Sequence, residues 1–132
     1  MLCQDIYDTA LRFIAEPGAS PASDADYRTR APYLLSAVCH EMGALDRETR
    51  RSQGLGVAAM PGGFSLPLTT AFPLCDRLGP AASYYLASAL VFDENPELSD
   101  RLFSRYSGSV AGIYREIPAT VGSTRDVYSA EE

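Results

Sequence analysis

The feature that most constrains this chain is a pair of apolar segments with helical periodicity, joined by a short acidic turn. The first segment, Cys75 to Phe92, is apolar nearly all round its helix, which predicts a buried central helix. The turn at 93–97 reads Asp-Glu-Asn-Pro-Glu, with Asn95 as helix cap and Pro96 at the first helical position. The sequence therefore predicts two helices joined by a capped turn.

Both of these helices have recognisable limits. The second keeps its apolar side chains on one stripe from Leu98 to Tyr114, and Pro118 is expected to end it. In the first, Asp76 can act as the cap and Pro80 falls in an early turn.

The first half of the chain predicts two more helices. One amphipathic pattern spans residues 1–16, and another starts near Asp24 or Asp26, either of which can cap it. Pro32 lies inside the second pattern and either kinks the helix or joins a lead-in turn to it. Because the apolar stripe continues in phase through the proline, we favour one kinked helix. Its charged end, 46–51, is interpreted as solvent-exposed.

Between the two halves lie a glycine-rich loop (53–63) and a proline-rich segment (64–74). The loop has the glycines but not the sequence of a phosphate-binding motif, and we expect it to be mobile. Pro67 and Pro73 forbid a regular helix, so the apolar side chains of the proline-rich segment lie extended along the core or on a neighbouring molecule.

These patterns predict an all-α fold, a small antiparallel bundle of about four helices with an irregular proline-rich connection. The bundle domain is expected to comprise residues 1–116. Residues 117–132 are expected to form a flexible C-terminal tail, either disordered or ordered only against a neighbouring subunit.

Composition narrows the possible partners. The 132 residues carry 17 acidic and 11 basic side chains, and a net charge of −6 disfavours binding to the phosphates of nucleic acid. The start of the chain lacks a secretory pattern, and no apolar run approaches the ~20 residues that span a bilayer. Three widely spaced cysteines predict neither a disulfide framework nor a zinc site and fit a reducing compartment.

No residue pattern predicts catalysis. His40, the single histidine, follows Cys39 on a helix, where adjacent side chains point in different directions. The acidic groups at 5/8, 24/26 and 93/94/97 lie near helix starts, where carboxylates favourably meet the helix dipole. We therefore expect a non-enzymatic protein with no cofactor and no metal.

The order of several short motifs resembles small head–tail connector (adaptor, neck) proteins of tailed phages and prophages. The motifs are Arg-Ala-Pro-Tyr-Leu-Leu (30–35), Leu-Pro-Leu (66–68), Phe-Pro-Leu (72–74), the apolar helix that follows, and Asp-Glu-Asn-Pro-Glu-Leu (93–98). The whole match runs from the N-terminal amphipathic helix to Phe103 and Tyr106 and covers roughly two thirds of the chain. The order of its motifs is more specific than any one of them. Connectors often carry acidic residues around Leu-Pro-Leu, whereas Ser65, Thr69 and Thr70 here are uncharged.

The resemblance implies a helical protein without enzymatic activity, located in the virion neck or the bacterial host cytoplasm. Such proteins assemble as rings beneath the portal, contact tail or neck proteins, and let DNA pass through. The glycine-rich loop and the residues after Ile117 would then contact other subunits or the portal. An acidic ring suits such a channel, because like charge repels DNA from its wall.

Seven apolar side chains are candidates for a subunit interface. They are Leu66, Leu68, Phe72, Tyr84, Ile117, Val121 and Tyr128. The alternative interpretation is a cytosolic helical module for protein–protein interaction or regulation, acting as a small homo-oligomer with an exposed apolar patch.

Overall fold

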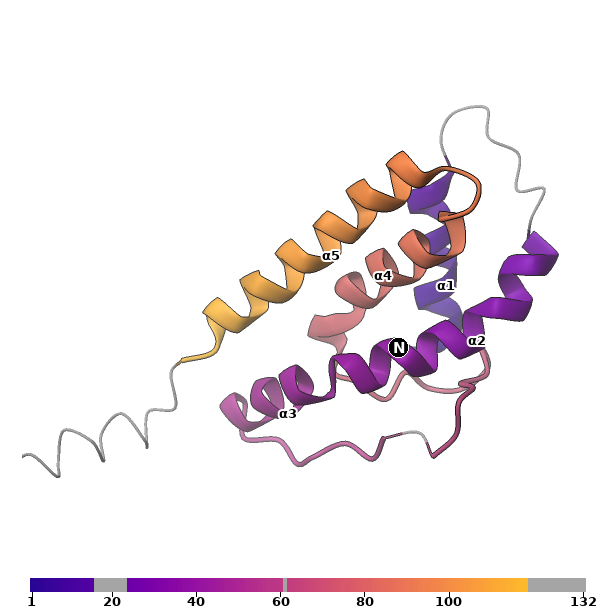
Figure 1. Ribbon diagram of the computed structural model, residues 1–132. Helices are drawn as coiled ribbons and strands as arrows, with labels where there is room; N and C mark the ends of the chain where they lie inside the picture. The colour runs from indigo at the N-terminus through magenta and orange to yellow at the C-terminus, as the bar shows by residue number, and fades with distance from the viewer. Residues whose placement is uncertain (16–23, 61, 119–132) are drawn as a thin grey trace, which may run out of the picture.

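The computed structural model describes residues 1–15, 24–60 and 62–118, and these form an all-helical fold (Figure 1). The elements are α1 (Cys3–Ile14), α2 (Asp24–Glu41), α3 (Gly43–Ser52), a 3-10 turn η1 (Asp76–Leu78), α4 (Gly79–Val91) and α5 (Pro96–Glu116). Within those ranges, extended pairing is limited to an isolated bridge between Leu2 and Ala71. The predicted fold class is confirmed.

Helix α4 is the centre of the bundle and packs against α1, α2 and α5. Nine of its 13 residues are buried, as the nearly all-round apolar sequence predicted. Several of these are Ala or Ser, which let neighbouring backbones approach closely. At the α4–α5 contact, the Ser88 hydroxyl donates to the Ser99 carbonyl (2.9 Å) and the Ser99 hydroxyl donates to the Ser88 carbonyl (2.8 Å). This reciprocal pair satisfies two buried hydroxyls inside the interface.

The start of α5 confirms its predicted cap. The Asn95 side-chain oxygen accepts a hydrogen bond from the Leu98 N–H (3.1 Å), and Pro96 occupies the first turn. The start of α4 differs from the prediction. Asp76 lies inside η1 instead of capping a helix, and α4 begins only at Gly79, with Pro80 in its first turn.

The expected single helix from residue 24 to residue 51 is wrong. Helix α2 continues through Pro32, and the interruption falls at Met42, which separates α2 from α3. Hydrogen bonds from the Met42 N–H to the Val38 carbonyl and from the Asp46 N–H to the Met42 carbonyl (2.9 Å each) bridge the break. Asp26 is not a cap, because it lies within α2 and pairs with Arg30.

The proline-rich segment lies along the chain's own core. The Leu66 N–H donates to the Pro32 carbonyl (2.9 Å), which fixes the segment on α2. The Cys3 and Gln4 N–H groups at the start of α1 donate to carbonyls of Thr70 and Leu68 (2.9 Å each). The segment thereby satisfies N–H groups that have no partner within the helix.

The charged end of the second predicted helix is not solvent-exposed throughout. Asp46 is fully buried, with one carboxylate oxygen accepting from the Cys75 N–H (2.8 Å) and the other from Arg50 Nε (2.9 Å). Arg50 also donates to the Pro73 carbonyl (3.1 Å), and Thr49 is buried. Asp46 and Arg50 therefore bind α3 to the end of the proline-rich segment.

Candidate interaction surfaces

The first candidate surface is a depression, named here the front hollow, where α2, α4 and α5 come together. It has a volume of about 360 Å³ and is lined by Arg30, Tyr85, Ser88, Ala89, Phe92, Asp93, Ser99 and Phe103. Phe92 and Phe103 are 59% and 48% exposed, unusually open for phenylalanine beside an apolar hollow. The hollow follows from the packing, since α2 and α5 both rest on α4 (Figure 1).

Aromatic rings continue from the front hollow into the core. Tyr85 meets Tyr106 edge-on (centroids 5.2 Å apart), and Phe103 lies against Tyr106 (5.6 Å). Burial raises the pKa of both tyrosines, and the nearby Glu41 carboxylate adds to the rise. Both phenols therefore stay neutral near pH 7 and serve as apolar surface with a polar tip.

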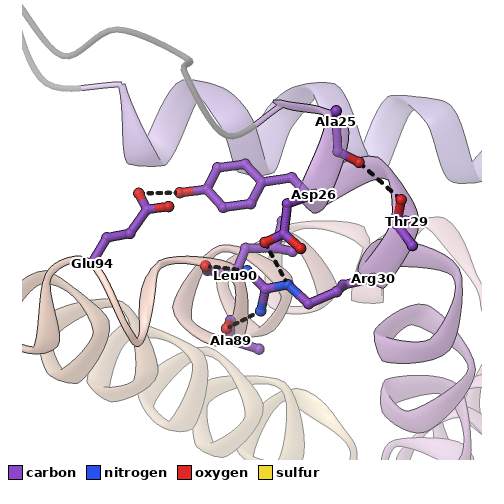
Figure 2. Close-up of polar contacts among 8 residues, drawn as sticks. Ala25, Asp26, Thr29, Arg30, Ala89, Leu90 and Glu94 are labelled. Atoms are coloured by element: carbon purple, nitrogen blue, oxygen red, sulfur yellow. Dashed lines mark hydrogen bonds and ion pairs between the residues drawn. The ribbon is translucent and has the colours of Figure 1, made fainter.

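Arg30 forms one wall of the front hollow and is held by its own chain (Figure 2). Its guanidinium donates to the carbonyls of Leu90 (2.9 Å) and Ala89 (3.4 Å) at the end of α4, and to Asp26 (3.0 Å). A cation is favourable at a helix C-terminus, where carbonyls lack helical partners. Nearby, the Tyr27 hydroxyl donates to Glu94 (2.7 Å) and ties α2 to the α4–α5 turn. Arg30 therefore has a structural role, because its guanidinium links α2 to the end of α4.

The second candidate surface, the arginine hollow, lies between α1, α4 and α5. It has a volume of about 250 Å³ and is lined by Phe13, Tyr84, Leu98, Arg101, Leu102 and Arg105. The Phe13 and Tyr84 rings are stacked, with centroids 4.6 Å apart and an interplanar angle of 13°. Arg101 and Arg105 are exposed and lie one turn apart on α5. The surface combines an aromatic floor with two cations.

A third group of exposed apolar side chains lies on the segment between α3 and the proline-rich segment. Leu55, Val57 and Phe64 are 53%, 75% and 91% exposed. The Ser36 hydroxyl donates to the Gly63 carbonyl (3.0 Å), which holds the chain beside Phe64 against α2. Figure 1 shows that the chain segment after α3 and helix α5 lie on opposite sides of α2 and α3.

The structure distributes the seven interface candidates among different environments. Leu66 and Phe72 are buried in the chain's own core, so their predicted interface role is corrected to core packing. Leu68 and Ile117 are half-buried against the core, and Tyr84 lines the arginine hollow. Val121 and Tyr128 lie outside the described residues.

Phe103 belongs to the apolar stripe predicted for the last helix, and Phe92 is a possible core position at the end of the apolar segment, but both side chains are exposed. The buried positions of α5 include Leu98, Leu102 and Tyr106, at a spacing of four residues. Phe103 is one residue away from Leu102, which turns it about 100° from that stripe. This offset was a signal in the sequence, whereas the exposure of Phe92 depends on where α4 ends.

His40 and Cys39 occupy different environments. His40 is exposed, whereas Cys39 is fully buried, and burial raises the pKa of its thiol to about 12. The two side chains therefore do not face a common cavity. Across residues 1–15, 24–60 and 62–118, no cluster of three or more His, Cys, Asp or Glu side chains is arranged to bind a metal ion. In the same ranges no helix has the length and apolar character needed to cross a membrane.

Comparison with protein-family models, with curated proteins and with solved structures found no match to this chain.

Proposed function

We propose that this protein is a non-enzymatic structural protein of a phage or prophage, a head–tail connector that assembles as a ring between portal and tail. The order of the sequence motifs supports this proposal, as does an all-α bundle of the kind the resemblance implies. Its partners would be copies of itself, the portal and the tail or neck proteins.

The observation that carries the proposal is the presence of unlike apolar surfaces on different parts of the molecule. Phe92 and Phe103 border a hollow, whereas Val57 and Phe64 are exposed on the segment that follows α3. A contact between two unlike patches is heterologous, and repeating it produces a closed ring or an open filament. An isologous dimer would instead use the same patch twice.

One feature favours a second candidate function, a small homo-oligomeric interaction module. The front hollow is a single apolar area with aromatic side chains from both α4 and α5. Two copies could cover it by facing each other about a two-fold axis. This arrangement would give a dimer of constant size with no free hollow.

Light scattering after size exclusion, together with negative-stain microscopy of the purified chain, separates the two functions. The connector proposal predicts rings of more than two copies, formed by the chain alone or on addition of a portal. The Phe103→Ser variant should weaken assembly about tenfold, because it removes an aromatic anchor from the interface. Tyr33→Ser is the matched control, because Tyr33 is also exposed but lies outside both hollows. A constant dimer supports the second function, and a monomer even with portal present contradicts both.

A further inference from the structure

We infer that the arginine hollow receives residues 119–132 of a second copy of this chain. The inference rests on the proposed self-assembly and names one of its contacts.

The arginine hollow has the size and chemistry of a receptor for side chains. Its volume of about 250 Å³ is below the ~300 Å³ at which sites for cofactors and drug-sized ligands begin. The stacked pair of Phe13 and Tyr84 offers a ring surface on which another aromatic ring can pack. Arg101 and Arg105 lie at the edge, where a guanidinium can meet a carboxylate in a two-bonded fork. An aromatic residue with carboxylates nearby fits this surface.

Residues 119–132 contain that combination. Their sequence has Val127 and Tyr128 followed by Glu131 and Glu132. Three residues of extended chain cover about 10 Å, so a ring packed in the hollow leaves the carboxylates within reach of cations at its edge. The charges are complementary, since the chain is acidic overall and the hollow presents two arginines.

The course of the chain at the end of α5 favours a second copy as the source of this segment. The arginine hollow is built on the first half of α5, and the chain leaves α5 at the other end, after Glu116. Ile117 is extended (φ −74°, ψ 117°) and precedes Pro118, which disfavours a helical turn back at this point. The fourteen residues 119–132 can span up to about 46 Å, enough to reach another subunit.

The contact is tested by reversing charges in the full-length chain and measuring sedimentation velocity over a range of concentrations. One variant carries Arg101→Glu and Arg105→Glu, and the other carries Glu131→Arg and Glu132→Arg. Each variant alone should self-associate about tenfold more weakly than the wild type, because like charges then meet in the contact. An equimolar mixture should recover association, since the basic segment of one variant meets the acidic hollow of the other.

Three controls keep the result interpretable. Arg115→Glu changes an exposed arginine near the far end of α5 and should leave association unchanged. Arg105→Glu alone should reduce association less than the double change, and Tyr128→Ser should reduce it without altering either arginine. Circular dichroism of each variant establishes that the helices form.

A direct binding measurement separates this inference from ring assembly. A fluorescein-labelled peptide of residues 119–132 is titrated with the full-length Glu131→Arg, Glu132→Arg variant, whose own segment is repelled from the hollow. The peptide should bind, and adding Arg101→Glu and Arg105→Glu to that chain should weaken binding about tenfold.

Peptide binding without higher oligomers would support the contact and contradict the ring. If either charge-reversal variant assembles as well as the wild type, the proposed contact is overturned and the proposed function still stands. Loss of association in each variant without recovery on mixing would also overturn it, because it would place the segment in the hollow of its own chain. A monomeric wild type that binds no peptide would overturn both.

Discussion

Replacing the buried carboxylate of Asp46 should cost more stability than any surface charge on the same helix. Asp46 is 0% exposed and has two partners, the Cys75 N–H at 2.8 Å and Arg50 Nε at 2.9 Å. Breaking a buried ion pair by removing one partner costs about 3–5 kcal/mol. Arg50 keeps the Pro73 carbonyl and its side chain is 20% exposed, which places Asp46→Ala near the low end, at about 3 kcal/mol.

Urea unfolding followed by circular dichroism measures this loss. Asp46→Asn retains an acceptor for the Cys75 N–H but not the charge facing Arg50, so we expect about half the loss, roughly 1.5 kcal/mol. Glu48→Ala is the matched control on α3, because its pair with Arg51 is partly solvated and contributes about 0–1 kcal/mol. The Asp46→Ala, Arg50→Ala double variant should lose less than the sum of its single variants. A difference of less than about 0.5 kcal/mol between the losses of Asp46→Ala and Glu48→Ala would contradict a stabilising role for the buried Asp46 carboxylate.

Three further predictions follow from the described contacts. Arg30→Ala should destabilise the fold by about 1 kcal/mol, because the change removes a cation from the end of α4. Arg47→Ala, at an exposed position, is the control, and thermal unfolding measures the difference between the two variants. Stability should fall as pH rises above about 9, because the pKa of Cys39 and the pKa of Tyr106 are raised in the fold and the unfolded chain therefore ionises first. The urea midpoint should be lower at pH 10.5 than at pH 8, and equal midpoints would contradict this prediction. Under native conditions Cys75 should react with a thiol reagent faster than the fully buried Cys39, and equal rates would contradict the packing.

The sequence was most informative where the signals were local. The cap at Asn95 and the apolar character of α4 depend on neighbouring residues, and both predictions are confirmed. Leu66 and Phe72 were harder to place, because an extended apolar segment packs equally well on its own core or on a neighbour. In the structure, backbone hydrogen bonds to α1 and α2 hold this segment on the chain's own core. These bonds join residues that are far apart in the chain.

Long-range contacts also explain what the sequence did not reveal. The run from Asp46 to Arg51 has the composition of an exposed helix end, and the partner that buries Asp46 is a backbone N–H 29 residues away. The two hollows likewise combine residues from separate helices, such as Phe13 with Arg105, which no spacing along the chain connects. Local patterns could therefore identify α4 and α5 but not the surfaces that their packing creates.

Native mass spectrometry of the purified wild-type chain tests the proposed self-assembly most directly. Assembly as a connector predicts a closed species that contains more than two copies, forms without ligand or enzyme, and is strengthened by a portal protein. Detection of the monomer alone at every concentration, with portal present as well as absent, would contradict it.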